Sequence, residues 1–380
     1  MSKTIRLLCF FLILISCCCC KNNTDTKRKT PLKKIVFSNR NVDILYNNEI
    51  ADSTSILKLE TRKESLIGEI SKMYMTDSLI IIYDQIESKI SIFDNRGSFI
   101  RNIGSKGKGP SEFIQITDMC FYPDSKQIEV FDIQLRKLLC YNINGDLLYV
   151  KRSKYDFLSF YRTKKGYWVY SSFDTRNPDK CNLLFLSNNL KTIKSEYCPA
   201  ENFYDRSNNH DNFVASSNGD LFFHYGCNDT IYKLNEKDAI PFLYVDFENR
   251  KVPYNKLSKL TSRQEYDRIL YFNKVRFGNL SNLLIEDNLM FFSCSKYSLE
   301  STPRYCAYCK LDSLNCRFYK EIVSNFPYEI SPKCIFKGKM VFLIYPCYLN
   351  PTNIKNLKKI FNVDVEYNDN PMLLFFYEKK

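Results

Sequence analysis

The sequence has few of the groups on which enzymes usually rely. Its 380 residues include two histidines, His210 and His224, and one tryptophan, Trp168. It contains neither the GxSxG serine elbow nor the HExxH zinc motif. His210 lies in a polar loop and His224 in an alternating, strand-like segment, which are ordinary structural contexts. These absences argue against a histidine-based metal site, against serine hydrolase chemistry and against a tryptophan platform for sugars.

A phosphate-binding loop is also missing. The stretch IGSKGKGPSEF at residues 103–113 contains three glycines and two lysines, a composition that invites this interpretation. However, Pro110 follows Gly109 where a phosphate loop has lysine, and Glu112 stands where a dinucleotide motif needs its third glycine. Glycine beside lysine is common in solvated turns, so the stretch is predicted to be a turn or a connection.

Positive charge is in excess but is not concentrated. Lysine and arginine number 55 against 42 aspartate and glutamate, a formal net charge of +13, and only residues 27–34 form a basic run. A dispersed excess favours weak attraction to anionic surfaces over a nucleic-acid groove. We therefore expect no nucleic-acid partner.

The first residues are typical of an export signal. Lys3 and Arg6 precede an apolar run at 7–15, which is too short to span a bilayer, and Ser16 then stands before Cys17. This layout predicts a signal peptide over residues 1–16 and a flexible tether over 17–40.

The end of this signal resembles the bacterial lipobox, whose cysteine becomes the acylated first residue of an exported lipoprotein. The matching residues are Leu14, Ile15, Ser16 and Cys17. The resemblance implies that Cys17 is lipidated and that the lipid anchors the chain to the outer membrane. Because Lys21 and not an acid follows the cysteines, we expect the periplasmic side. An ordinary signal peptide with a chance cysteine is the alternative.

Eleven of the 16 cysteines lie beyond residue 20, so in an exported chain they cannot all pair with one another. Cys306, Cys309 and Cys316 lie close together and include a CxxC pair. A zinc site usually needs a second pair or nearby histidines, and the segment has a strand-like pattern. These cysteines are predicted to be small buried hydrophobic residues, with a metal site or a disulfide as the alternatives.

An internal repeat of 48 residues is the dominant feature of the sequence. Two segments of strand-like character, 79–100 and 128–148, align position by position. The aligned pairs are Asp84 with Asp132, Ile90 with Leu138, Phe93 with Tyr141, Gly97 with Gly145, and Ile100 with Leu148. The glycines fit positive-φ turn positions, and the aspartates fit turns better than a catalytic role because they recur at one place in the unit.

Later units are degenerate but have the same strand-like runs. Units of three or four strands at 40–50 residues are typical of propeller blades, and residues 41–380 accommodate about six or seven of them. Two helical insertions interrupt the pattern, one after Ser262, which forms a possible capping box with Glu265, and one after Thr352. A ring of this kind would close by pairing the C-terminal strand with residues 42–46 or 55–60.

The chain resembles the six-bladed β-propeller lipoproteins of anaerobic Gram-negative bacteria, which are similar to NHL-repeat propellers. The resemblance rests on five segments taken in order: 67–70, 103–113, 228–234, 242–247 and 368–377. It implies an all-β, six-bladed β-propeller with two short helical insertions. It also implies that 103–113 joins the outer strand of one blade to the next blade, which Phe113 starts.

The expected function is that of a membrane-anchored binding or scaffolding propeller without catalysis, cofactor or metal. Its ligand would be a peptide, a glycan or a partner protein. Candidate contact residues are Lys106, Lys108 and Glu112, together with the polar stretch 201–213, because connections between strands are the variable, solvent-facing part of such a fold. The alternative is a propeller hydrolase or lyase with an acid-based metal site, which inward carboxylates would favour.

Overall fold

A computed structural model describes residues 32–37, 42–46, 49, 51–171, 181–194, 211–226, 228–236, 238–260, 262–272, 274–299, 304–323 and 331–378. The chain divides into two compact units, residues 1–33 and residues 34–380. The fold described below is that of the second unit. The predicted signal peptide, Cys17 and most of the predicted tether lie outside the described residues. Of the helices that are described, none is long and apolar enough to cross a membrane.

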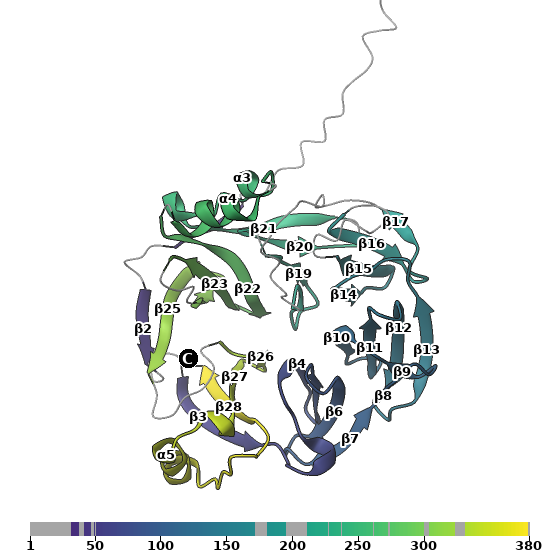
Figure 1. Ribbon diagram of the computed structural model, residues 1–380. Helices are drawn as coiled ribbons and strands as arrows, with labels where there is room; N and C mark the ends of the chain where they lie inside the picture. The colour runs from purple at the N-terminus through teal and green to yellow at the C-terminus, as the bar shows by residue number, and fades with distance from the viewer. Residues whose placement is uncertain are drawn as a thin grey trace, which may run out of the picture. The chain divides into compact units, whose positions relative to one another are not determined.

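Six sheets follow one another around a ring within residues 34–380 (Figure 1), as the predicted six-bladed β-propeller requires. Each sheet is a blade in which consecutive strands pair antiparallel from the centre outward. Blade 1 contains β4 (Ile70–Met75), β5 (Leu79–Asp84), β6 (Lys89–Asp94) and β7 (Phe99–Ile103). Blade 2 contains β10 (Ile116–Tyr122), β11 (Gln127–Asp132), β12 (Lys137–Asn142) and β13 (Leu147–Arg152). Blade 3 contains β14 (Ser159–Arg162), β15 (Gly166–Tyr170), β16 (Leu183–Ser187) and β17 (Thr192–Lys194).

The other three blades recruit strands from the N-terminal part of the chain. Blade 4 contains β18 (Phe213–Ala215), β19 (Leu221–Phe223), β20 (Thr230–Leu234), β21 (Ala239–Asp246) and, outermost, β1 (Lys33–Val36). Blade 5 contains β22 (Arg276–Glu286), β23 (Leu289–Tyr297), β24 (Arg304–Lys310), β25 (Asn315–Val323) and, outermost, β2 (Val42–Tyr46). Blade 6 contains β26 (Cys334–Phe336), β27 (Lys339–Ile344), β28 (Met372–Glu378) and, outermost, β3 (Ala51–Lys58).

The ring closes where β3 pairs antiparallel with β28, with Lys58 opposite Met372 and Thr54 opposite Phe376. This pairing confirms closure through the segment predicted at 55–60. Closure through residues 42–46 was the wrong alternative, because β2 instead runs parallel to β25 as a fifth strand of blade 5. Only β3 leads directly into blade 1, so it is the strand that joins the last blade to the first.

The turns of blades 1 and 2 follow the repeat. Gly97 and Gly145 have φ angles of +83° and +92°. The Asp84 Oδ1 accepts from Ile86 N at 2.9 Å within the turn, whereas its Oδ2 accepts from Gly68 N at 2.6 Å. One blade later, Asp132 Oδ1 accepts from Leu135 N of its own turn at 3.0 Å, and its Oδ2 accepts from Ile114 N at 2.6 Å. The predicted turn role of the aspartates is confirmed, and each also ties its hairpin to the segment that enters the blade.

The stretch 103–113 is the predicted joint between β7 and blade 2. It folds back on itself through the short parallel pair β8 (Ser105–Lys106) and β9 (Glu112–Phe113). Gly104 has a φ of +65°, where other residues are strained. Phe113 is buried in the core between blades 1 and 2, three residues before the inner strand β10 begins.

Short helices lie between blades and within blade 6. They are η2 (Lys63–Ser65), η3 (Glu248–Arg250), α3 (Tyr254–Leu257), α4 (Arg263–Asp267), η4 (Arg268–Phe272), η5 (Pro346–Tyr348) and α5 (Pro351–Phe361). The side chain of Ser262 caps α4 by accepting from Glu265 N, as predicted. The second predicted insertion is α5, which begins at Pro351, just before Thr352, and is capped by Asn350.

The cysteine prediction is partly wrong. Cys309 and Cys316 form a disulfide, because β24 and β25 place them directly opposite each other with a Cα–Cα distance of 4.1 Å. Sequence reasoning missed this pair because it assigned the strands without their register. Cys306 is a free, buried cysteine, as predicted. Trp168 is fully buried in the core.

Candidate functional site

The innermost strands of the blades surround the centre of the ring (Figure 1), and polar side chains from four blades contact one another there. The central polar cluster comprises Lys72, Asp118, Ser159, Asp211 and Asn212, which belong to blades 1 to 4. Lys72 Nζ donates to Asp118 Oδ1 at 2.5 Å and lies 3.7 Å from Asp211 Oδ1. Because blades 1 and 4 face each other in a six-bladed ring, this second ion pair reaches across the centre.

Burial and pairing set the charges of this cluster. Burial raises the pKa of Asp118 to about 6, and the attraction of Lys72 opposes that rise. Burial acts to lower the pKa of Lys72, but the attraction of Asp118 and other groups outweighs it, so that this pKa lies well above its ordinary value. Phe160 N also donates to Asp118 Oδ2 at 2.9 Å. Lys72 and Asp118 are therefore both ionised at neutral pH, and the lysine is held as a fixed positive charge.

The cluster continues into blade 4 by hydrogen bonds. Ser159 Oγ donates to Asn212 Oδ1 at 3.0 Å, and Asn212 Nδ2 donates to the carbonyl of His224 at 3.0 Å. The imidazole of His224 bonds through Nε2 to the carbonyl of Asp211 at 2.8 Å. Burial lowers the pKa of His224, so this ring is neutral at neutral pH. Among the described residues, no group of three or more His, Cys, Asp or Glu is placed to hold a metal ion.

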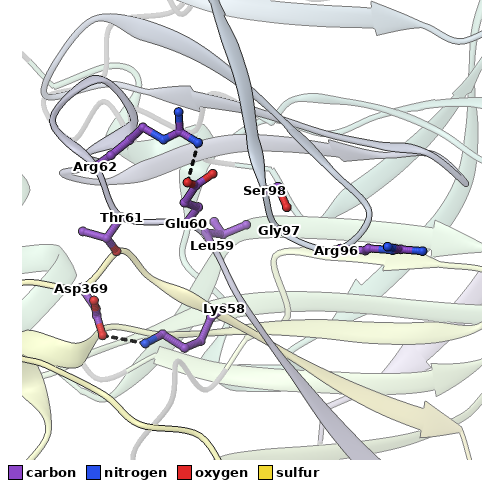
Figure 2. Close-up of a pocket in the computed structure, with 9 residues that line it drawn as sticks. All are labelled: Lys58, Leu59, Glu60, Thr61, Arg62, Arg96, Gly97, Ser98 and Asp369. Carbon is purple, nitrogen blue, oxygen red and sulfur yellow. Dashed lines mark hydrogen bonds and ion pairs between the residues drawn. The ribbon is translucent and has the colours of Figure 1, made fainter.

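A pocket of about 580 Å³ lies at the seam where the ring closes, and we call it the closure pocket (Figure 2). Its walls come from the end of β3, from the turn between β6 and β7, and from the residue that precedes Asn370 and β28. The lining residues are Lys58, Leu59, Glu60, Thr61, Arg62, Arg96, Gly97, Ser98 and Asp369.

Two ion pairs line one side of the closure pocket. Lys58 Nζ donates to Asp369 Oδ2 at 2.9 Å, and Arg62 pairs with Glu60 Oε1. The side chain of Arg96 extends from the turn, apart from both pairs (Figure 2). It is exposed and has no hydrogen-bond or ion-pair partner among the described residues. The pocket therefore contains three cations and two acids.

The seam is held by backbone contacts as well as by charge. Glu60 N donates to the carbonyl of Gly97 at 2.8 Å, and Phe99 N donates to Glu60 Oε2 at 2.7 Å. The bond from Phe99 N, followed by that from Arg62, lowers the pKa of Glu60. Gly97 packs so closely that a Cβ atom would lie 2.0 Å from the carbonyl oxygen of Lys58. The turn and the closing strand thus form a defined wall.

The residues predicted from the sequence lie elsewhere. Lys106 and Lys108 are exposed in the joint after blade 1. Glu112 lies in the same joint, but its Oε2 accepts from Gly109 N at 2.7 Å, so this carboxylate shapes the loop. Residues 201–210 of the second predicted stretch lie outside the described residues, and Asp211 from the end of that stretch contributes to the central polar cluster.

Sequence reasoning missed the closure pocket. Gly97 was identified only as a turn glycine, and nothing in the sequence connects residues 58–62 with Asp369, which ring closure brings together. A small signal was present, because the predicted pairing of 55–60 with the C-terminal strand places Lys58 near the residues that precede this strand.

Comparisons with known proteins support the fold. The profile of a family described as Domain of unknown function (DUF4934) matches residues 33–377. The chain belongs to this family. A search of curated proteins found no match.

Solved structures share the architecture at low identity. A candidate exported protein from Bacteroides fragilis superposes with a TM-score of 0.74 at 17% identity, covering 92% of this chain and 100% of that one. A member of the duf4221 family from Bacteroides vulgatus gives a TM-score of 0.53 at 13% identity, covering 87% and 97%. Virginiamycin B lyase from Staphylococcus aureus, at a TM-score of 0.42 and 8% identity over 85% and 98%, is too distant to support an argument about function. These similarities show the fold alone.

Proposed function

We propose that this chain is an exported, lipid-anchored propeller that binds a ligand and does not transform it. The observation that carries the proposal is the position of Lys72. Its ammonium group contacts Asp118 and Asp211, the two carboxylates that an acid-based metal site at the centre of the ring would use. A cation already lies between these acids, so a metal ion that bound them would have to displace a buried lysine.

Two further features support binding as the function. The closure pocket has a volume within the range of small-molecule sites, of roughly 300–1,000 Å³. The joint with Lys106 and Lys108 offers exposed cations for a second contact. Replacing both lysines by alanine is expected to weaken partner capture without lowering the melting temperature, because exposed loop charges rarely change stability by more than about 0.5 kcal/mol.

One experiment distinguishes a binding function from a catalytic one. The purified protein is incubated with small esters, lactones and glycosides, with and without added divalent cations, and the molecules that copurify with it are identified by mass spectrometry. We expect a copurifying ligand and no turnover. Turnover that a chelator abolishes, and that Asp118→Asn or Asp211→Asn also abolishes, would establish the alternative, a hydrolase or lyase with an acid-based metal site.

The anchor is proposed from the lipobox resemblance at Cys17 and from the exported character of the Bacteroides fragilis neighbour. Acyl chains at this cysteine would hold the protein on a membrane, for which we propose the periplasmic side of the outer membrane. Cys17→Ser is expected to move the protein into the soluble periplasmic fraction. A variant that stays in the membrane fraction and still carries acyl label refutes the assignment.

A further inference from the structure

We infer that the closure pocket binds a carboxylated saccharide, with Arg96 as the residue that pairs with a carboxylate of the sugar. This inference rests on the proposed binding function and specifies its ligand. It follows from three properties of the lining residues that the structure describes: the acids are already paired, the one cation without a partner is a guanidinium, and the walls are polar.

The acids of the pocket already have partners, so they have little remaining capacity to accept hydrogen bonds from a ligand or to repel an anion. Glu60 uses one oxygen on Arg62 and the other on the backbone N–H of Phe99. Asp369 Oδ2 accepts from Lys58 and also from Glu366 N at 2.9 Å. Each acid is thus neutralised by its own lysine or arginine. The net positive charge of the pocket comes from Arg96.

Hydrogen-bond donors remain after these pairs are formed. The guanidinium of Arg96 has five N–H groups and no partner among the described residues. Lys58 Nζ donates to the carbonyl of Asp364 at 2.6 Å and to Asp369, which leaves one of its three N–H groups. Arg62 uses one terminal nitrogen on Glu60. A planar guanidinium binds a carboxylate through two parallel hydrogen bonds, which makes a carboxylate the matching anion for Arg96.

The lining favours a hydroxylated molecule over a peptide. Leu59 is the only apolar side chain among the lining residues, and it is 1% exposed, so peptide side chains find no apolar surface there. Thr61 and Ser98 contribute hydroxyl groups (Figure 2). None of the described lining residues is aromatic, so they offer no ring for stacking. Recognition would therefore depend on charge and hydrogen bonds, which suits a uronic acid better than a neutral sugar.

The pocket is also large and preformed. A volume of about 580 Å³ exceeds what a single carboxylate needs, so a ligand held by Arg96 also has room for its sugar rings. Gly97 and Glu60 lock the turn that bears Arg96 against β3. A wall that is already ordered saves the entropy of ordering it on binding.

The test uses the purified full chain and isothermal titration calorimetry. Trigalacturonate is compared with an uncharged trisaccharide and with triglutamate, for the wild type, for Arg96→Gln and for Arg152→Gln. Arg152 is an exposed arginine at the end of β13, so its substitution removes the same charge away from the pocket. We expect trigalacturonate alone to bind, and Arg96→Gln to weaken it by roughly tenfold or more, as for loss of a charged hydrogen-bonded pair. Arg152→Gln should bind as the wild type does.

Three results would overturn the inference: no binding of trigalacturonate, equal weakening by both substitutions, or binding of triglutamate in its place. The proposed function is judged separately by the copurified molecule. If that molecule binds the wild type and Arg96→Gln equally, the pocket assignment fails while the binding function stands. If the protein turns over a substrate, the binding function itself fails.

Discussion

Two glycines in equivalent turns allow the strength of the ring-closure seam to be measured. Gly97 and Gly219 have φ angles of +83° and +85°, and each donates its N–H to the carbonyl three residues earlier at 3.0 Å. They differ in what surrounds them. A Cβ atom at Gly97 would lie 2.0 Å from the carbonyl oxygen of Lys58, whereas a Cβ at Gly219 would meet nothing within 4 Å.

The expected cost of an alanine follows from this difference. At both positions, a left-handed alanine costs roughly 1–2 kcal/mol relative to glycine. At Gly97 the turn must also move away from β3, because the atom it meets is backbone. That movement breaks the bond from Glu60 N to Gly97 and strains the bond from Phe99 N to Glu60, at about 1 kcal/mol each. Gly97→Ala should therefore lose about 2 kcal/mol more than Gly219→Ala.

Urea unfolding of the two variants and the wild type measures these losses. Trp168 is the only tryptophan and is fully buried, so its fluorescence reports on unfolding. We expect Gly219→Ala to lower the free energy of unfolding by roughly 1–2 kcal/mol and Gly97→Ala by roughly 3–4 kcal/mol, with unchanged slopes. Equal losses for the two variants would show that the turn does not press on the closing strand, and the description of the seam would be wrong.

Three other predictions concern stability. Deleting residues 371–380 removes β28 and leaves β3 unpaired, so the protein should aggregate; a truncated protein that melts at the parent temperature contradicts closure. Burial raises the pKa of Asp229 to about 8, so the folded state binds an extra proton and stability falls as pH rises from about 4 to 8. Between pH 5 and pH 9, the free energy of unfolding of Asp229→Asn, measured in urea, should rise relative to that of the wild type by on the order of a few kcal/mol. Identical pH profiles of this free energy in the two proteins would refute the prediction. Replacing Cys309 and Cys316 by alanine should cost about 2 kcal/mol, whereas alkylation of both in unreduced, denatured protein would disprove the disulfide.

The parts of the fold that could be predicted are those encoded by local turn chemistry. Gly97 and Gly145 occupy left-handed turn positions, and Asp84 accepts from its own turn, and all of this is visible within one repeat unit. Periodic strands then predicted about six or seven blades, and the resemblance to a known family reduced this number to six. The pairing of 55–60 with the C-terminal strand was also accessible, since a ring of sheets leaves exposed edges unless its ends pair.

Features that depend on register or on contacts between distant segments could not be predicted. Cys309 and Cys316 pair because a hairpin aligns them, and one residue of slippage would place them on opposite faces. Asp118 and Asp211 meet Lys72 only because three separate blades converge at the centre. Lys72 and Asp118 have an ordinary strand context in the sequence and Asp211 lies in a polar stretch, so the sequence contains no signal that connects the three.

The N-terminal strands explain why the seam is a suitable place for a ligand. Along the chain, β1, β2 and β3 supply the outermost strands of blades 4, 5 and 6 in turn, and β3 alone links its blade to blade 1. The closure pocket therefore contains residues from both ends of the ring. A ligand that contacts β3, the turn at Gly97 and the segment before β28 binds only the closed ring, because opening separates these walls. Such a ligand stabilises the whole propeller, by about 2.7 kcal/mol at a concentration 100 times its dissociation constant.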